Sequence, residues 1–136
     1  MKLQRLSPIL WTKNLEETIS FYKNVLGFIS YSNFSNFASL TRDNIEIMFI
    51  VPTSEPDDCK DSDDKDEFFP KPHFTGSIFI FLENVDELWN NVKDKATIKS
   101  QIADRVYLVR DFSILDNNGY EIVFGQDISG SKFSPL

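Results

Sequence analysis

The fold of this chain follows from a short stretch near its start, Asn14-Leu15-Glu16-Glu17-Thr18-Ile19-Ser20-Phe21-Tyr22. Asn14 can accept a hydrogen bond from an unpaired backbone N–H at a helix start, and Glu17 stands at the position that completes such a cap. Apolar residues then recur at helical spacing, and Gly27 suits the left-handed residue that ends many helices. The pattern predicts an amphipathic helix between Asn14 and Gly27.

A second copy of this pattern begins 70 residues later, where Asn84-Val85-Asp86-Glu87 predicts another helix start. Short apolar stretches predict strands around each helix. These strands are residues 3–12, 28–31, 37–41 and 45–51 in the first half, and 76–82, 97–101, 106–115 and 120–125 in the second. Residues 37–49 overlay residues 112–124 without a gap at an offset of 75. Chance similarity of two amphipathic hairpins is the alternative, but the shared order of elements favours an internal repeat.

The repeat predicts an α+β fold in which two βαβββ modules form a curved mixed sheet around a concave groove. We expect a single domain, with module 1 at about residues 1–52, an acidic linker at about 53–73, module 2 at about 74–128 and a loose tail at 129–136. The linker is rich in aspartate between residues 54 and 67 and is flanked by prolines, which is typical of a solvated loop. The groove is the expected ligand site, since binding sites favour concave surfaces.

Charge and composition narrow the classes of partner. The net charge of −7 would repel nucleic acid and attract a cationic small molecule. We expect no membrane contact, because no run of about 18 apolar residues is present. Cys59 is the only cysteine, and the first residues lack the apolar run of a signal peptide, so we expect a cytoplasmic protein.

Several motifs resemble those of the glyoxalase/bleomycin resistance protein/dioxygenase (vicinal oxygen chelate) superfamily. They are Ser7-Pro8-Ile9-Leu10, residues 14–22, Leu26-Gly27-Phe28 and the closing run from Arg110 to Gly119. Pro8, Phe37-Ala38, Arg42-Asp43 and Asp86-Glu87-Leu88 make the bleomycin-resistance branch the most similar. The resemblance implies the fold of this family and a homodimer.

The resemblance also implies where a metal would lie. In the metal-using members, four histidine or glutamate side chains hold one divalent cation, and their positions correspond here to Ser7, Met48, Ser77 and Val123. None of these suits Zn²⁺, Ni²⁺, Mn²⁺ or Fe²⁺. A two-residue slip would replace Met48 and Val123 by Glu46 and Glu121, still without an imidazole, and the only histidine, His73, lies elsewhere. We therefore expect no metal and no cofactor.

Strand alternation predicts which side chains line the groove. Ser7, Ile9 and Trp11 would face it, while Ile45, Ile47, Phe49, Ile78, Ile80 and Leu82 would pack under the helices. The predicted ligand-binding residues are Ser7, Trp11, Phe37, Glu46, Met48, Ser77, Phe79, Phe81, Arg110, Glu121 and Val123. Phe37 and Phe79 match positions where, by the resemblance, bleomycin-resistance proteins place stacking rings. The alternatives are core packing for any one ring, and a solvated rim position for either glutamate.

The pattern favours a metal-free protein that sequesters an aromatic or cationic compound over an enzyme. Two carboxylates in one groove would repel each other unless a cation intervenes, which favours a basic ligand. The alternative is an enzyme of the lyase, isomerase or dioxygenase type. It would use Glu46 or Glu121 as a metal-independent general base, or a metal held by ligands other than those assigned above. No other catalytic residue is predicted.

Overall fold

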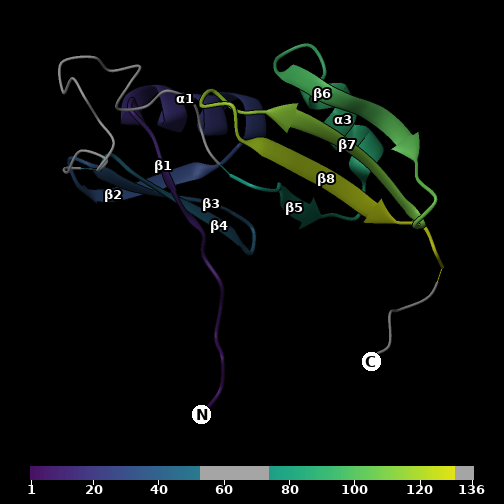
Figure 1. The fold of residues 1–136 in the computed structure, drawn as a ribbon, viewed down its shortest axis with the longest axis horizontal. Coiled ribbons are helices and arrows are strands. Elements are labelled where there is room, and N and C mark those ends of the chain that lie inside the picture. Colours follow the sequence, from purple (N-terminus) through teal and green to yellow (C-terminus); the bar gives the residue numbers. More distant parts are fainter. Residues whose placement is uncertain (53–73, 131–136) are drawn as a thin grey trace. The chain divides into compact units, whose positions relative to one another are not determined.

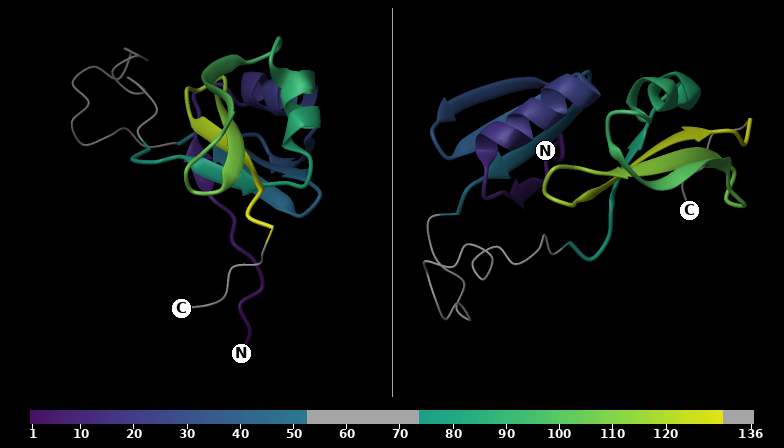
Figure 2. Two further views of the ribbon diagram at one scale, coloured as in Figure 1. Left: turned by 90° about the vertical axis from the view of Figure 1, so that its right-hand side faces the viewer. Right: turned by 90° about the horizontal axis from the view of Figure 1, so that it is seen from above.

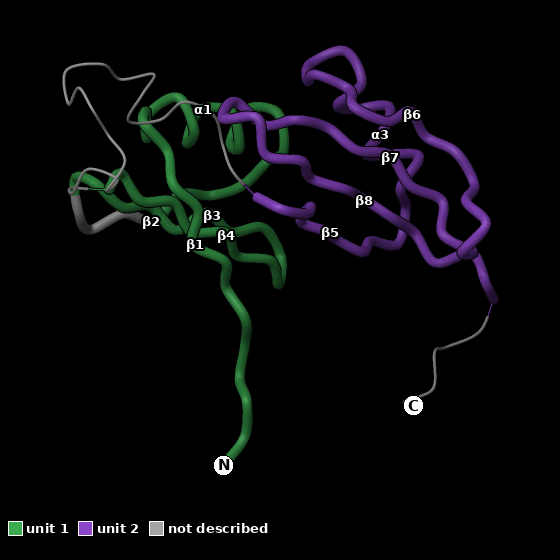
Figure 3. The backbone as a smooth tube through the Cα atoms, in the orientation of Figure 1, with its two compact units in different colours: residues 1–73 green, residues 74–136 purple. Residues whose placement is uncertain are grey.

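A computed structural model describes residues 1–52 and 74–130, with only the backbone for residues 32–34. The chain forms two compact units, unit 1 (residues 1–73) and unit 2 (residues 74–136), which Figure 3 shows in different colours. The described part of each unit contains one helix and one four-stranded sheet in the chain order βαβββ. The predicted α+β fold with a repeated βαβββ module is therefore confirmed.

In unit 1, the strands lie in the order β1-β4-β3-β2, with β1 parallel to β4 and the other pairs antiparallel (Figure 1). The elements are β1 (Ile9–Trp11), α1 (Leu15–Leu26), β2 (Ile29–Phe34), β3 (Phe37–Arg42) and β4 (Ile45–Ile50). The predicted cap is confirmed, because the Asn14 side chain accepts a hydrogen bond from the Glu17 N–H at 3.0 Å. Gly27 ends α1 with a φ of 71°, which favours glycine.

Unit 2 repeats this topology in the order β5-β8-β7-β6, with β5 parallel to β8. Its elements are β5 (Ile78–Phe81), α3 (Val85–Val92), β6 (Thr97–Asp104), β7 (Val109–Leu115) and β8 (Glu121–Asp127). Asn84 caps α3 by accepting from the Glu87 N–H at 3.3 Å. The two helix starts quoted from the sequence thus use the same chemistry. None of the helices in the described ranges is long and apolar enough to cross a membrane.

Each helix covers one face of the sheet in its own unit, as Figure 2 shows for α1, and this contact forms the core. The buried apolar residues include Tyr22, Leu26, Ala38, Leu40, Ile47 and Phe49 in unit 1, and Val85, Leu88, Val92, Phe112, Ile114, Ile122 and Phe124 in unit 2. Burial at every second position follows the predicted alternation in β3 and β4, whereas β7 is buried at four consecutive positions, 111–114. The opposite face of each sheet, which we call its open face, carries the candidate functional residues.

Several predicted strands have other bounds in the structure, among them β2, β5 and β6, and two further cases show why. The first is shorter than residues 3–12, because residues 1–8 lie outside any strand and Leu3 and Leu6 are exposed. The predicted strand 106–115 begins only at Val109, since residues 106–108 form the turn that follows β6. Leu108 in this turn has a φ of 63°, which is rare for a leucine. Apolar composition alone therefore overestimated both strands.

The gapless overlay of residues 37–49 on 112–124 is wrong by one residue in its first half. Ser39 pairs with Met48, and Ser113 pairs with Val123, so β3 and β7 correspond at an offset of 74 while β4 and β8 correspond at 75. Between equivalent positions, the chain from β7 to β8 is therefore one residue longer than the chain from β3 to β4. Because alternation has a period of two, this insertion moves every β7 side chain to the face opposite the one that the overlay implies.

Candidate functional site

The open face of unit 1 is arranged in three rows across the sheet. Its carboxylate row contains Ser7, Glu46, Thr41 and Ile29; its middle row contains Ile9, Met48, Ser39 and Tyr31; and its aromatic row contains Trp11, Ile50 and Phe37. Neighbouring rows are about 7 Å apart, because two residues separate them along each strand. A carboxylate thus stands at one end of this face and aromatic side chains stand at the other.

Glu46 is the centre of the polar contacts on this face. The Ser7 hydroxyl donates a hydrogen bond to its Oε1, and the Ser39 hydroxyl donates one to its Oε2 at 2.5 Å. Arg5 Nη1 lies 3.7 Å from the same Oε1. These partners come from two segments of the chain, residues 5–7 and β3, and both segments lie beside Glu46 on β4.

The hydrogen bonds from Ser39 and Ser7, in that order, lower the pKa of Glu46 below its ordinary value of 4.5, and the charge of Arg5 adds a smaller effect. Partial burial acts in the opposite direction. The Glu46 side chain is 15% exposed, so the carboxylate is shielded but still reachable by a ligand. Glu46 is therefore a fixed negative charge at neutral pH and a weak general base.

Large apolar side chains on the same face are unusually exposed. Ile9 is 55% exposed, Trp11 50% and Tyr31 61%. Their neighbours of opposite parity, such as Leu10 and Phe49, are buried, and the Phe49 ring lies 5.2 Å from the ring of Tyr22 on α1. An apolar surface around a shielded carboxylate suits a ligand with a positive group and an apolar body.

The open face of unit 2 has the same strand layout but different chemistry. Phe79 and Phe81 are 40% and 60% exposed, and their ring centroids lie 4.7 Å apart. Glu121 faces Lys99, whose Nζ lies 3.4 Å from its Oε1. A Cβ atom added to Gly125 would lie 2.8 Å from the Phe79 ring. The absence of a side chain at Gly125 therefore lets this ring lie close against β8.

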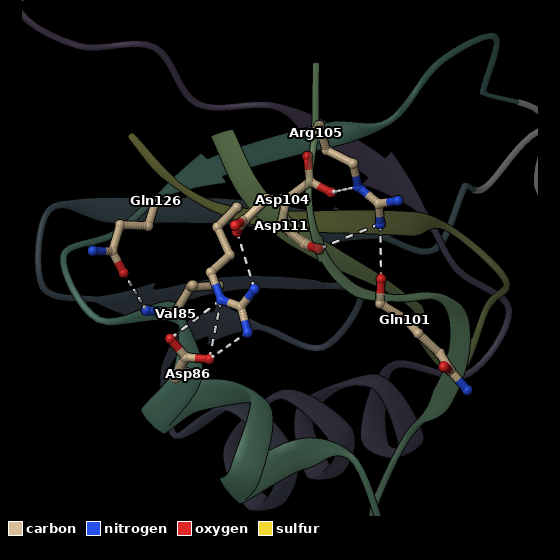
Figure 4. A network of polar contacts seen from close by, with 8 residues as sticks. Val85, Asp86, Gln101, Asp104, Arg105, Asp111 and Gln126 are labelled. Carbon is tan, nitrogen blue, oxygen red and sulfur yellow. Dashed lines mark hydrogen bonds and ion pairs between the residues drawn. The ribbon is translucent and has the colours of Figure 1, made fainter. Parts of the chain in front are cut away.

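Unit 2 also contains a buried carboxylate that the sequence analysis missed. The Asp111 side chain is 5% exposed and accepts a hydrogen bond from Arg105 Nε at 2.9 Å (Figure 4). It also accepts one from the Tyr107 hydroxyl at 2.5 Å. Arg105 also donates to the Gln101 carbonyl at 2.7 Å. The hydrogen bond to Asp111 raises the pKa of Tyr107, with burial as a smaller cause, so this phenol stays protonated. The cluster fixes the turn between β6 and β7.

Arg110 does not lie on the open face with the other predicted ligand-binding residues. It pairs with Asp86 at 2.9 Å and with Asp104 at 3.0 Å, and both contacts raise its pKa. Alternation along β7 places Arg110 on the same side as Phe112, the side that α3 covers. Close by, the Val85 N–H donates to Gln126 Oε1 at 3.1 Å, which ties the start of α3 to β8 (Figure 4). Arg110 is therefore removed from the candidate set as a residue that holds the fold.

The remaining predicted residues divide between the two open faces. Unit 1 brings together Ser7, Trp11, Phe37, Glu46 and Met48, and unit 2 brings together Ser77, Phe79, Phe81, Glu121 and Val123. Sequence reasoning missed Arg5, Ser39 and Tyr31 in unit 1. Ser39 shares the parity of Phe37, so alternation along β3 would have found it.

The residues at the positions implied for a metal do not fit a divalent cation. In unit 1, Ser7 contacts Glu46, and the residue that pairs with Met48 is Ile9. This arrangement corresponds to the register slipped by two residues, in which Glu46 takes the place of Met48. At these described positions the carboxylate is Glu46, and it already accepts two serine hydroxyls. Across residues 1–52 and 74–130, no three histidine, cysteine, aspartate or glutamate side chains are grouped as metal ligands. His73, Cys59 and the acidic segment 54–67 lie outside the described residues.

Comparisons with known proteins agree with the fold. The sequence profile described as the Glyoxalase/Bleomycin resistance protein/Dioxygenase superfamily matches residues 3–124. No curated protein matches the chain in a sequence search.

Among solved structures, a glyoxalase/bleomycin resistance protein/dioxygenase from Nocardioides is 16% identical, with a TM-score of 0.68 over 100% of this chain and 91% of that one. TioX from Micromonospora sp. ML1 is also 16% identical, with a TM-score of 0.70 over 91% and 98% of the two chains. A glyoxalase/bleomycin resistance protein/dioxygenase from Alicyclobacillus acidocaldarius is 11% identical, with a TM-score of 0.70 over 93% and 92%. At such low identities these structures show a shared fold.

Proposed function

The chain belongs to the glyoxalase/bleomycin resistance protein/dioxygenase superfamily, and we propose that it binds and sequesters a small organic cation on the open face of unit 1. The observation that carries this proposal is the Glu46 carboxylate, held by two serine hydroxyls among exposed apolar side chains. The proposal assigns the chain to the ligand-binding, metal-free type of member, like the bleomycin-resistance branch. The expected homodimer and cytoplasmic location stay predictions.

The position of Glu46 supports a cationic ligand. Its two oxygens each accept one hydroxyl, which fixes the orientation of the carboxylate before any ligand arrives. A hydrogen bond to a charged group contributes about 1.5–3 kcal/mol, more than one between neutral groups. The net charge of −7 adds a general attraction for cations. A basic group is therefore the ligand feature that Glu46 would select.

The length of the face indicates the rest of the ligand. Ile50 is four positions after Glu46 along β4, so the carboxylate row and the aromatic row are about 13 Å apart. Met48 and Ile9 form an apolar path between these rows. Trp11 at the far end offers a ring face for stacking or for a cation–π contact. The ligand class that fits is an organic cation with a flat or apolar body.

Binding is favoured over catalysis by the protonation behaviour of Glu46. A general base for work near neutral pH needs a pKa close to that pH, whereas the pKa of Glu46 is lowered. The geometry therefore offers no support for the alternative enzyme in which Glu46 abstracts a proton. Metal analysis of the purified protein provides a separate check, because a stoichiometric divalent cation would contradict the metal-free proposal.

The direct test is a fluorescence titration at pH 8 with two dyes of the same shape, cationic 9-aminoacridine and neutral acridine. We expect the wild-type protein to prefer 9-aminoacridine, and Glu46→Gln to weaken its binding about tenfold, which equals about 1.4 kcal/mol. Acridine binding should change less than about twofold, because its contacts are apolar.

The matched control is Glu121→Gln in unit 2, which removes the same charge from a carboxylate already paired with Lys99. We expect this variant to bind 9-aminoacridine within about twofold of the wild type. Equal binding of the two dyes by the wild type, or an unchanged affinity in Glu46→Gln, would contradict the proposal.

A further inference from the structure

We infer that Arg5 forms an ion pair with the Glu46 carboxylate in the free protein, and that a cationic ligand displaces Arg5 when it binds. This inference rests on the proposed function, because it concerns regulation of the same site. Arg5 Nη1 lies 3.7 Å from Glu46 Oε1, the position that the positive group of a ligand would take. The protein thus carries an internal competitor for its own binding face.

The segment that carries Arg5 is held to the sheet by few contacts. Residues 1–8 lie outside any strand, and Leu3 and Leu6 on either side of Arg5 are exposed. The contacts that hold this segment beside β4 include the Ser7 hydroxyl on Glu46 and the Pro8 carbonyl, which accepts from the Met48 N–H at 2.9 Å. Ser7 and Pro8 can therefore stay in place while the Arg5 side chain leaves.

The exposure of Arg5 sets how strongly it competes. Its side chain is 76% exposed, whereas that of Glu46 is 15% exposed, so the guanidinium is already hydrated and loses little when it moves into water. Exposed ion pairs of this kind change an equilibrium by at most about fivefold. Arg5 therefore neutralises Glu46 in the empty protein without blocking a ligand that makes further apolar contacts.

The experiment compares Arg5→Gln with Lys2→Gln, two variants of the same segment that lose the same charge. We expect Arg5→Gln to raise the affinity for 9-aminoacridine at pH 8 about threefold, whereas Lys2→Gln should leave it nearly unchanged. Arg5→Lys should behave more like the wild type, because it retains a competing cation. In a Glu46→Gln background, Arg5→Gln should have no effect, since the two changes act on one contact.

Equal affinities of Arg5→Gln and Lys2→Gln for 9-aminoacridine would overturn the inference. A lower affinity in Arg5→Gln than in the wild type would also overturn it, because Arg5 would then be part of the binding surface. Both outcomes differ from failure of the proposed function. If the proposed function were wrong, 9-aminoacridine would bind equally with and without the Glu46 carboxylate, whatever residue stands at position 5.

Discussion

The open faces of the two units share one backbone layout and use it for different purposes. In unit 1, Glu46 stands between two serine hydroxyls, and exposed apolar side chains surround it. In unit 2, the corresponding Glu121 faces a lysine, and the more deeply buried carboxylate is Asp111, which accepts from Arg105 and Tyr107. A repeated βαβββ module therefore fixes where side chains point, while a few substitutions decide whether a carboxylate is left for a ligand or bound within the protein.

This difference predicts that removal of a carboxylate lowers the free energy of unfolding more in unit 2 than in unit 1. Asp111→Ala would leave Arg105, which is only partly exposed, without its main partner, and would also free the Tyr107 hydroxyl. Breaking a fully buried pair costs about 3–5 kcal/mol, so for this partly exposed one we expect a loss of about 2–3 kcal/mol in the free energy of unfolding. Urea denaturation of the whole chain measures this loss.

Glu46→Gln is the control for that comparison. We expect it to change the free energy of unfolding by less than about 1 kcal/mol, because Glu46 is reachable by water and its serine partners can bond to an amide. Equal destabilisation by the two variants would show that both carboxylates hold the fold, and would remove the contrast between the units.

A second contrast concerns the position opposite the last residue of the first strand in each unit. Trp11 pairs with Ile50 in unit 1, whereas Phe81 pairs with Gly125 in unit 2. Gly125→Ala would place a Cβ 2.7 Å from Val109 Cγ1 and 2.8 Å from the Phe79 ring. Such overpacking costs about 1–3 kcal/mol, so we expect about 2 kcal/mol of destabilisation by thermal unfolding.

Gly76→Ala is the matched control, since a Cβ there would meet no heavy atom within 4 Å. Its effect should stay within about 0.5 kcal/mol. Adding Phe79→Ala to Gly125→Ala should recover part of the loss, because it removes one of the two clashes. Equal effects of the two glycine substitutions would show that the Phe79 ring is not held against β8.

The sequence was sufficient for the local features of the fold. Asn14 and Asn84 mark both helix starts because capping depends only on neighbouring residues. Alternation correctly separated exposed Trp11 from buried Leu10. These predictions hold because each depends on a single segment of the chain.

Features that depend on two strands were harder to predict. The contact between Ser39 and Glu46 requires the pairing of β3 with β4, and the extra residue between β7 and β8 hid the equivalence of Phe37 and Asp111. The predicted ligand-binding role of Arg110 is another example, because its contacts with Asp86 and Asp104 join separate elements and do not show in the sequence. A one-residue insertion reverses the parity of a strand, so composition alone cannot assign its faces.

The two units also differ in the contacts of one pair of equivalent serines, Ser39 in unit 1 and Ser113 in unit 2. They occupy equivalent positions, but the Ser39 hydroxyl donates to Glu46, whereas the buried Ser113 hydroxyl has no hydrogen-bond partner among the described residues. Hydrogen bonding to Ser39 is the largest cause of the lowered pKa of Glu46. A lowered carboxylate pKa stabilises the folded protein above the ordinary value of 4.5, and this contribution is lost as the pH falls through the folded-state pKa.

Ser39→Ala should therefore raise the pKa of Glu46 toward its ordinary value, although Ser7 and Arg5 still favour the charged form. Because the cation needs the carboxylate, 9-aminoacridine should be released at a higher pH in this variant as the solution is acidified. An NMR titration of the Glu46 side chain measures the pKa, and Ser113→Ala should leave it unchanged. A shift of the same size in both serine variants would mean that the pKa follows the packing of the sheets, and that the hydroxyl beside Glu46 has no special role.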